Sequence, residues 1–344
     1  MTTGAAEAPL RVALVSTLRT SVPPVRTGSV ELLVGLMAEE LHRRGHEVTV
    51  FATGDSRVPG RLLSVLPAGY HDDATVWDWR LAEFMQMGLA FEHASEFDVI
   101  HSHSYIYALP FSRLVGTPVV HTLHISPTPD FVRFCRQHPD DSYVLISRAQ
   151  QRTFEDVPVA GVVHNGIDID AFAFGATPAG YLAFIGDIRP DKRPLDAIRV
   201  AREAGVPIHL AGPESQYFAD AVKPLVDGRS VVWRGELDHA AKVELLSGAV
   251  ATIFFPAFGE SCPLVVLESM ACGTPVLSID AGPVPELVAQ DIGGVWVEEM
   301  PQMAAALERA AALDRRAVRA YAVERFSVAR MVDEYVAIYR RALA

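Results

Sequence analysis

The chain has 344 residues, 50% of them hydrophobic, and a formal net charge of −12. This length exceeds that of most single domains and favours two domains, each with its own core. The acidic balance argues against a nucleic-acid partner, because contacts from basic side chains to phosphates dominate such binding. Three cysteines without a CxxC pair, and the lack of any apolar run of membrane-spanning length, indicate a cytoplasmic protein with reduced thiols and no transmembrane segment.

The start of the chain predicts a strand, a loop, a helix and a second strand. An apolar run at 11–16 indicates a buried parallel strand, and a loop with Pro and Gly at 19–28 leads to a helix over 30–44. Gly45 ends this helix, and a strand at 47–51 follows. The last residue of the loop, Gly28, has no Cβ, so it lets the backbone approach a ligand at the helix start.

Histidines mark the ends of the next two predicted strands. Beyond a helix over 76–96, a strand at 97–103 places His101 and His103 on one face, because side chains alternate along a strand. The next strand, at 118–124, adds His121 and His124. Four histidines near strand ends leave a metal cluster open as one interpretation.

The second half of the chain alternates between strands and helices. Such alternation predicts an α/β fold with a parallel, doubly wound sheet, whose ligands bind where a strand turns into its helix. Arg189 and Lys192 lie in the first such turn. Strands are predicted at 143–147, 181–186, 207–211, 230–233 and 250–255, and helices over 192–204, 215–226, 239–248, 299–313 and 328–343.

A loop, a helix and a strand are predicted in succession over 256–279. Pro263 suits the first position of a helix over 263–272, since its missing N–H is not needed there. Gly273 stops this helix, and a buried strand at 275–279 follows.

The start of this helix is a predicted ligand site. The free N–H groups of Leu264 and Val265 point out of the helix, and such a helix start binds phosphate. Glu260 precedes the helix and Glu268 lies more than a turn inside it. The two carboxylates can therefore accept hydrogen bonds from sugar hydroxyls on either side of a nucleotide diphosphate.

The two glutamates, with seven residues between them and Ser-Met-Ala-Cys-Gly-Thr-Pro-Val after the second, resemble the donor-site signature of the retaining glycosyltransferases of family 4. The resemblance extends over nearly the whole chain from Arg11. Further segments that carry it are Gly28-Ser-Val-Glu31, Phe97-Asp-Val-Ile-His101, Thr122-Leu-His124, Asn165-Gly-Ile-Asp168 and Arg234-Gly-Glu236.

The family resemblance implies the GT-B fold, in which two Rossmann-like, doubly wound domains face a central cleft. It assigns residues 1–172 to an acceptor-side domain, on which a C-terminal helix within 328–344 packs back. Residues 173–327 are then the domain that binds the nucleotide sugar.

The resemblance also implies the activity, which is transfer of a sugar from a nucleotide sugar, UDP-type in our expectation, to a hydroxyl of a small-molecule or oligosaccharide acceptor. The anomeric configuration is retained, and no cofactor or obligatory metal is implied. His124 at the donor sugar, Glu260 at its hydroxyls and Lys192 at the diphosphate take the catalytic roles. The other implied contacts with the nucleotide sugar are Gly28, Ser29, Arg189, Gly235, Ser261, Cys262, Pro263, Leu264, Val265 and, at the ribose, Glu268.

Two family elements are altered in this chain. In the element Gly-Arg-x-x-x-x-Lys-Gly, Asp187 stands where Arg is usual and Arg193 where the last Gly is usual, while Lys192 keeps its place. We therefore expect Lys192 to bind the pyrophosphate, with Arg189 in place of the missing Arg. In the donor loop, Ser261-Cys-Pro263 replaces Gly-Phe-Gly, a feature that resembles transferases of antibiotic biosynthesis.

Three other functions stay open at the level of the sequence. A nucleotide-sugar epimerase of the same fold consumes no acceptor, and a metal hydrolase built on His101, His103, His121 and His124 contains metal. A sugar-nucleotide binding module without catalysis is favoured only by the loss of the usual Arg at Asp187.

Overall fold

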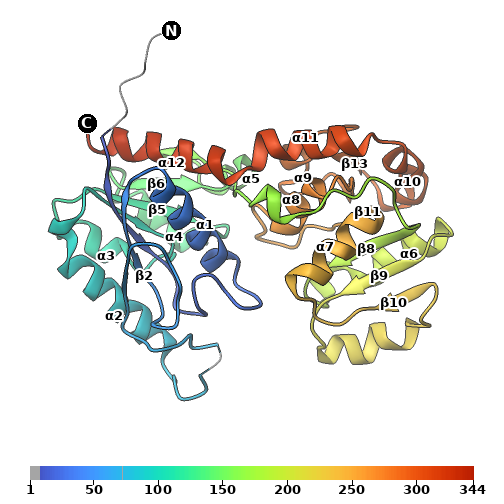
Figure 1. Cartoon of the computed structure of the whole chain (residues 1–344), viewed down its shortest axis with the longest axis horizontal. Helices are drawn as coiled ribbons and strands as arrows, with labels where there is room; N and C mark the ends of the chain where they lie inside the picture. Colours follow the sequence, from blue (N-terminus) through green and yellow to red (C-terminus); the bar gives the residue numbers. More distant parts are fainter. Residues whose placement is uncertain (1–7, 72) are drawn as a thin grey trace, which may run out of the picture. The chain divides into compact units, whose positions relative to one another are not determined.

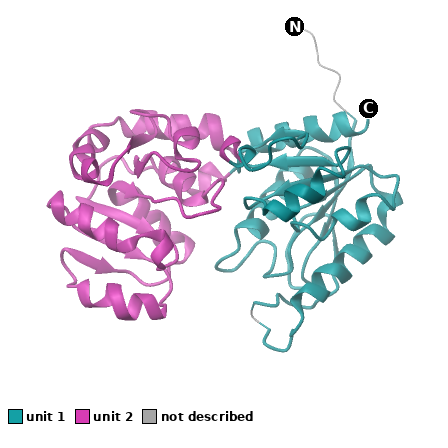
Figure 2. Ribbon diagram, turned by 180° about the vertical axis from the view of Figure 1, so that it is seen from behind, with its two compact units in different colours: residues 1–146, 150–166, 328–344 teal, residues 147–149, 167–327 magenta. Residues whose placement is uncertain are grey.

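The computed structural model describes residues 8–71 and 73–344 (Figure 1). Their contacts divide the chain into two compact units (Figure 2). Unit 1 comprises the residues up to 146 together with 150–166 and 328–344, and unit 2 comprises 147–149 and 167–327. The sequence-based boundary at 172/173 lies a few residues further along the chain than the exchange at 166/167.

A parallel sheet forms the centre of unit 1. Its strand order is β3-β2-β1-β4-β5-β6-β7, so the direction in which the chain adds strands reverses between β1 and β4. Apolar runs form these strands because both faces of a parallel sheet are covered. The strands are β1 (Arg11–Val15), β2 (Glu47–Phe51), β3 (Arg61–Leu63), β4 (Val99–Ser102), β5 (Val119–Leu123), β6 (Ser142–Leu145) and β7 (Gly161–Val162).

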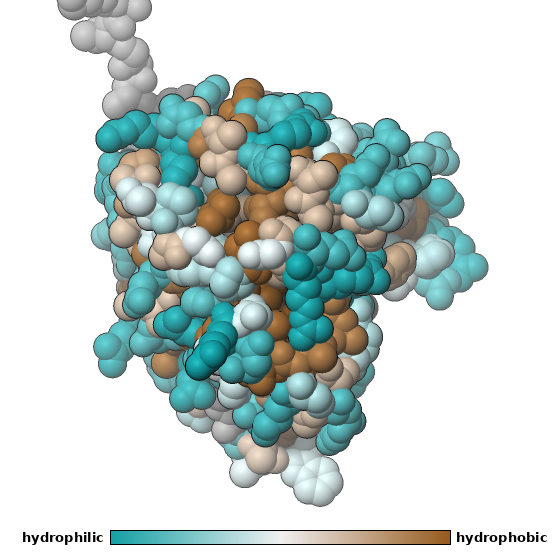
Figure 3. Space-filling view, turned by 90° about the vertical axis from the view of Figure 1, so that its right-hand side faces the viewer, coloured by the Kyte–Doolittle hydropathy of each residue, from teal (hydrophilic) through white to brown (hydrophobic). Residues whose placement is uncertain are grey.

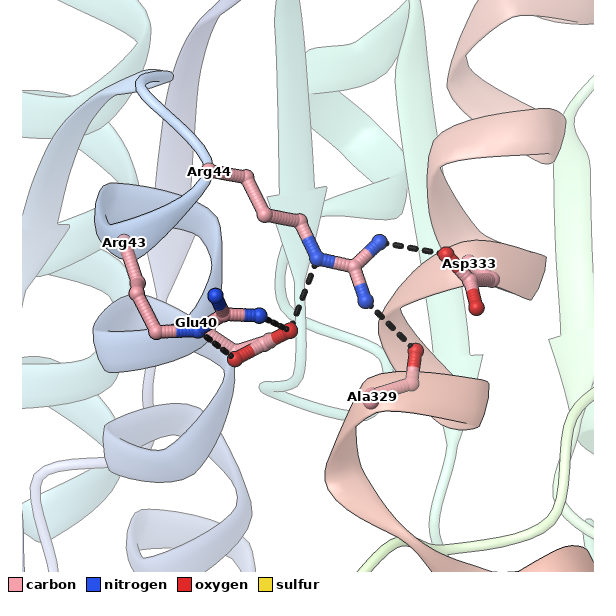
Figure 4. A network of polar contacts seen from close by, with 5 residues as sticks. All are labelled: Glu40, Arg43, Arg44, Ala329 and Asp333. Atoms are coloured by element: carbon pink, nitrogen blue, oxygen red, sulfur yellow. Dashed lines mark hydrogen bonds and ion pairs between the residues drawn. The ribbon is translucent and has the colours of Figure 1, made fainter.

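The last helix of the chain packs in unit 1. The guanidinium of Arg44 donates hydrogen bonds to Glu40, 2.8 Å away, to Asp333, 2.5 Å away, and to the carbonyl of Ala329 (Figure 4). These contacts join the end of α1 to α12. The helices that contribute to this unit are α1 (Ser29–Arg43), α2 (Trp79–Glu92), α3 (Leu109–Ser112), α4 (Pro129–Cys135), α5 (Arg148–Gln151) and α12 (Val328–Ala342), with a 3-10 turn, η1 (Ala94–Glu96).

Unit 2 contains a second parallel sheet, with the order β10-β9-β8-β11-β12-β13. Here the reversal falls between β8 and β11. The predicted pair of doubly wound sheets is thus confirmed. The strands are β8 (Tyr181–Ile185), β9 (Ile208–Ala211), β10 (Val231–Trp233), β11 (Ala249–Ile253), β12 (Val276–Ile279) and β13 (Gly294–Val297), of which β13 was not predicted.

Two predicted helices of unit 2 are wrong in detail. The helix expected over 215–226 is instead a π turn, η4 (Phe218–Val222), followed by a 3-10 turn, η5 (Lys223–Leu225). Pro224 accounts for the break, because proline lacks an N–H and its ring clashes with the preceding turn of an α-helix. The helix expected over 192–204 begins only at Pro194. The remaining elements are η2 (Ile169–Ala171), η3 (Pro190–Lys192), α6 (Pro194–Glu203), α7 (His239–Gly248), α8 (Leu264–Ala271), α9 (Val284–Leu287), η6 (Met300–Gln302), α10 (Met303–Ala311) and α11 (Arg315–Phe326).

The helix α11 was not predicted, and it supports the candidate site. Asp314 caps it by accepting a hydrogen bond from the N–H of Arg316 at 2.9 Å. The side chain of Arg319 donates to the carbonyls of Phe172 and Ala271. It thereby ties the segment before β8 to the end of α8.

The surface mixes apolar and charged side chains. On the face drawn in Figure 3, hydrophilic side chains surround an apolar centre. Among the described residues, no helix combines the length and apolar character needed to cross a membrane.

Candidate active site

Two loops meet where the strand order of unit 2 reverses. The strands β8 and β11 pair directly in the sheet. Lys192 lies in the loop after β8, and Glu260 in the loop after β11. Nζ of Lys192 donates a hydrogen bond to Oε1 of Glu260. Ligands of doubly wound sheets bind at this kind of reversal, so the pair marks a candidate site.

The carboxylate of Glu260 is held from both sides. Its second oxygen, Oε2, accepts a hydrogen bond from the N–H of Ala257 at 2.7 Å. The side chains of Lys192 and Glu260 are 18% and 22% exposed, so both remain accessible to a ligand. An anion that binds Lys192 would compete with Glu260 for its ammonium group.

The start of α8 differs slightly from the prediction. Pro263 is the residue before the helix rather than its first residue, and its carbonyl accepts from the N–H of Val266 at 3.2 Å. The N–H groups of Leu264 and Val265 therefore open the helix, as expected. Because proline lacks an N–H, it adds no donor to this anion site.

Two residues just before α8 are buried rather than exposed at the candidate site. The side chains of Ser261 and Cys262 are buried, and Oγ of Ser261 donates to the carbonyl of Gly259 at 3.3 Å. We infer that both residues shape the donor loop from below. The neighbouring Phe258, in contrast, is fully exposed.

The second glutamate has a partner that was not predicted. Glu268 is only 4% exposed, and its Oε1 accepts a hydrogen bond from Nζ of Lys242 at 2.5 Å. The ammonium of Lys242 also lies 5.6 Å from the ring centroid of Phe172. A buried carboxylate is costly without such a partner. The sequence contains one signal for this pairing, which is the scarcity of lysine. Two of the chain's three lysines pair with the two glutamates.

The predicted substitute cation, Arg189, is engaged elsewhere. It lies 3.0 Å from Asp191 and 3.8 Å from Asp187, with half of its side chain exposed. The N–H of Lys192 donates to the carbonyl of Arg189 at 3.1 Å, but within the described part of the chain no hydrogen bond or ion pair joins the guanidinium of Arg189 to the side chain of Lys192 or Glu260. The structure thus brings Lys192 to Glu260 but leaves Arg189 paired with its own acidic neighbours.

The backbone explains why glycine is usual at the position of Arg193. This residue has φ 57°, in the left-handed region that side chains other than glycine rarely adopt. Its guanidinium pairs with Asp196 at 2.6 Å and lies 5.0 Å from the ring centroid of Phe255. These contacts stabilise the conformation that glycine adopts without strain, so the turn before α6 is kept.

Gly235 lies further along the same edge of the sheet, after β10. Its φ is 73°, and its carbonyl accepts from the N–H of Gly212 at 2.9 Å. Because Gly212 follows β9, this bond links the loops after two adjacent strands.

In unit 1, Gly28 directly precedes α1, and Ser29 is the first residue of that helix. The φ of Gly28 is 155°, and a Cβ there would lie 2.7 Å from Thr20 and 2.9 Å from the carboxylate of Glu31. No other residue fits without a shift in these neighbours. The loop after β1 therefore passes α1 in close contact, while the approach of a ligand at Gly28 stays a prediction.

Two buried carboxylates hold this loop. Glu31 accepts a hydrogen bond from the hydroxyl of Thr17 at 2.5 Å, and burial raises the pKa of Glu31. Glu83, from α2, accepts from the N–H of Leu18 at 2.9 Å and from the hydroxyl of Ser104 at 3.0 Å. Burial raises the pKa of Glu83 to about 7.

Two of the four histidines serve packing in unit 1. Nδ1 of His101 lies 2.6 Å from the hydroxyl of Tyr339, and Nε2 lies 2.7 Å from that of Thr122. Both ring nitrogens of His101 therefore already have hydrogen-bond partners. The ring of His121 is buried beside Tyr143, and burial lowers its pKa to about 3. Among the described residues no three metal-ligating side chains gather, so the geometry does not favour the hydrolase alternative.

The other two histidines form a pair at the carboxyl ends of β4 and β5. Nδ1 of His103 lies 2.8 Å from Nε2 of His124, and the two rings meet edge to edge, with their centroids 5.1 Å apart and their planes inclined by 24°. Burial lowers the pKa of both, that of His124 to about 4, so both rings are neutral near pH 7. His124 alone is partly exposed.

Comparison with known families covers both units. The family described as Glycosyltransferase Family 4 matches residues 30–171, and that described as Glycosyl transferases group 1 matches residues 171–325. The D-inositol 3-phosphate glycosyltransferase of Mycolicibacterium smegmatis is 28% identical over 98% of this chain and 92% of its own length. That of Mycolicibacterium paratuberculosis is 29% identical over 92% and 86%.

Solved structures agree with this assignment. AviGT4, a glycosyltransferase involved in avilamycin A biosynthesis, has a TM-score of 0.72 and 26% identity, covering 97% of this chain and 98% of its own. Two structures at 17% identity share the fold. The sucrose-phosphate synthase of Thermosynechococcus elongatus has a TM-score of 0.76 over 96% of this chain and 98% of its own, and HepE of Anabaena with UDP has 0.72 over 96% and 100%. The family matches, the strand order of the two sheets and these neighbours together show that the chain belongs to the family 4 glycosyltransferases with the GT-B fold.

Proposed function

We propose that this glycosyltransferase moves a sugar from a UDP-sugar to a hydroxyl of a small-molecule or oligosaccharide acceptor, with retention of the anomeric configuration. The observation that carries the proposal is the pair of Lys192 and Glu260 at the sheet reversal of unit 2, beside the open start of α8. HepE, whose fold this chain shares, was crystallised with UDP and with UDP-glucose, which supports the choice of base.

The departing diphosphate is the group that most needs stabilisation in this reaction, because negative charge grows on it as the glycosidic bond breaks. Lys192 supplies a cation, and the N–H groups of Leu264 and Val265 supply dipoles at a helix start. Once the diphosphate takes Lys192 as its partner, Glu260 is released to accept hydrogen bonds from the hydroxyls of the donor sugar. Arg189 can add a second cation only if it leaves Asp187 and Asp191.

We assign the contacts with the ribose to Glu268, the second of the two glutamates. Glu268 can accept hydrogen bonds from the two ribose hydroxyls, while Lys242 balances the charge of the buried carboxylate. This arrangement fixes the nucleotide independently of the sugar that it carries.

The proposal also gives roles to residues of unit 1. His124 is assigned to the donor sugar, and the loop after β1, with Gly28 and Ser29, is assigned to the phosphates. No covalent nucleophile is required if the acceptor attacks from the side of the leaving group. The acceptor oxygen then bonds to the anomeric carbon, the bond to the phosphate oxygen breaks, and that oxygen takes the acceptor's proton.

The acceptor is the finer part of the proposal. One similar enzyme is named as a D-inositol 3-phosphate glycosyltransferase, and another is involved in avilamycin A biosynthesis. A role in antibiotic biosynthesis is therefore one candidate for this chain, and a polyol phosphate acceptor is the other.

A two-step experiment tests the proposed function. Thermal shifts with UDP, GDP, ADP and dTDP come first, since a ligand stabilises the fold in proportion to its binding. We expect the largest shift with UDP. UDP-sugars are then incubated with inositol 3-phosphate and with oligosaccharides, and products are identified by mass spectrometry. Turnover that requires an acceptor supports a transferase, whereas a changed sugar without any acceptor supports the epimerase instead.

A further inference from the structure

The contact between His103 and His124 carries an inference beyond the assignment of His124 to the donor sugar. His103 is 2% exposed. One face of its ring lies against His101, with ring centroids 4.0 Å apart, and the ring edge that carries Nδ1 faces Nε2 of His124. The backbone N–H of His103 donates to the carbonyl of Val15 on β1 at 2.9 Å. His103 is therefore a fixed point against which His124 can be oriented.

The short contact between the two rings is a hydrogen bond with a single shared proton. Each neutral imidazole has one N–H and one acceptor nitrogen, so one ring donates across the 2.8 Å between Nδ1 of His103 and Nε2 of His124 and the other accepts. The direction of this hydrogen bond decides which nitrogen of His124 carries its proton.

The second ring nitrogen of His103, Nε2, determines the direction of this hydrogen bond. Its Nε2 is buried and has no hydrogen-bond partner among the described residues. Were His103 the acceptor, its only N–H would lie on Nε2, buried without an acceptor. Buried N–H groups without partners are rarer in proteins than under-satisfied acceptors. His103 therefore donates from Nδ1, and Nε2 of His124 accepts.

We propose that His103 is a positioning residue that holds His124 in the tautomer protonated on Nδ1, so that His124 offers an N–H to a bound hydroxyl group. The consequence for catalysis rests on the proposed function, in which this group is a donor-sugar hydroxyl. The tautomer itself does not, because it follows from contacts within unit 1.

Nuclear magnetic resonance of the histidine side chains tests the tautomer directly. The full chain, labelled with ¹⁵N at histidine, is measured at pH 7 without nucleotide, and two-bond ¹H–¹⁵N correlations show which ring nitrogen is protonated. The signals of His124 are assigned by their loss in His124→Gln. We expect the pattern of an Nδ1–H tautomer for His124, and an Nε2–H pattern would overturn the proposal.

Two substitutions of His103 separate positioning from packing. His103→Asn keeps an N–H near the place of Nδ1, whereas His103→Leu keeps bulk but removes the donor. We expect the Asn variant to keep the tautomer of His124 and most of the turnover. The Leu variant should lose the single tautomer and lower kcat/KM for the UDP-sugar on the order of tenfold, the effect of one hydrogen bond.

Unchanged His124 signals and unchanged turnover in the Leu variant would overturn the proposal. Should the Leu variant fail to fold, the wild-type spectrum and the Asn variant still decide. Failure of the proposed function has a different signature: the Nδ1–H tautomer would be present in a chain that transfers no sugar from any donor and acceptor pair.

Discussion

Nζ of Lys242 lies 2.5 Å from Oε1 of Glu268, and the two residues come from neighbouring helices, α7 and α8. The pair places a compensated carboxylate, rather than an isolated one, at the proposed ribose site. Since Glu268 is almost fully buried, removal of Lys242 would leave a buried carboxylate without its cation, which costs more free energy than an unpaired acid on the surface.

The Lys242–Glu268 pair predicts coupled effects on nucleoside binding. Lys242→Met and Glu268→Gln should each weaken both uridine and UDP, because both ligands contain the ribose. The double variant should show a coupling energy of about 0.5–3 kcal/mol in a double-mutant cycle measured by calorimetry. Glu244→Gln, an exposed acid on α7, is the control and should bind as the wild type does. Strictly additive effects would show that Lys242 and Glu268 act independently of each other.

Lys192→Ala should weaken UDP far more than uridine. A charge-assisted hydrogen bond contributes about 1.5–3 kcal/mol, so the dissociation constant for UDP should rise about ten- to a hundredfold. Lys223→Ala removes an exposed lysine of the same unit and serves as the matched control. Equal losses for the two ligands in calorimetry would remove Lys192 from the diphosphate site.

Glu260→Gln should separate catalysis from nucleotide binding. If Glu260 contacts the donor sugar, UDP should bind at least as tightly as to the wild type, because the carboxylate that competes for Lys192 is lost, while turnover falls roughly ten- to several-hundredfold. The amide oxygen can still accept from the N–H of Ala257, so the loop should keep its shape. Normal turnover in this variant, measured with saturating UDP-sugar, would show that Glu260 is an ordinary loop acid.

Glu83 should make the stability of the protein depend on pH. Its folded pKa of about 7 lies above the ordinary value of 4.5, so the native state binds more protons than the unfolded state between these values. The contribution of Glu83 is therefore fully present below about pH 4.5 and is lost as the pH rises to about 7, on the order of 3 kcal/mol in total.

The comparison with Glu83→Gln isolates this effect from that of the buried histidines, which act in the opposite direction at acidic pH. The melting temperature of the wild type, relative to that of the variant, should increase as the pH is lowered from 8 to 5. A constant difference across this range would mean that Glu83 titrates at the same pH in both states.

The sequence predicted the architecture because its signals are local. Buried parallel strands appear as short apolar runs, and Gly45 or Gly273 marks the end of a helix. The prediction failed where the helix over 215–226 was extended across Pro224, although proline is itself a local signal for a break. The helix α11 was missed although Asp314 is a typical N-cap residue.

Two of the predicted site residues lie together in the structure for a physical reason. The topology of doubly wound sheets brings the loops after β8 and β11 together, so Lys192 and Glu260 were both expected near one ligand. Their hydrogen bond joins residues 68 positions apart, and no local pattern shows it. The partner of Glu268 and the acidic partners of Arg189 depend on side-chain positions in three dimensions, which periodicity and motif spacing do not encode.

The distribution of lysine offers a way to observe the site without mutating it. Reagents that acetylate primary amines meet only three side chains in this protein, since the other 27 of its 30 basic residues are arginines. In the proposed complex, bound nucleotide would shield Lys192 and leave exposed Lys223 open to modification. Mass spectrometry of the acetylated peptides, with Lys223 as an internal reference, would thus report site occupancy in an unaltered chain.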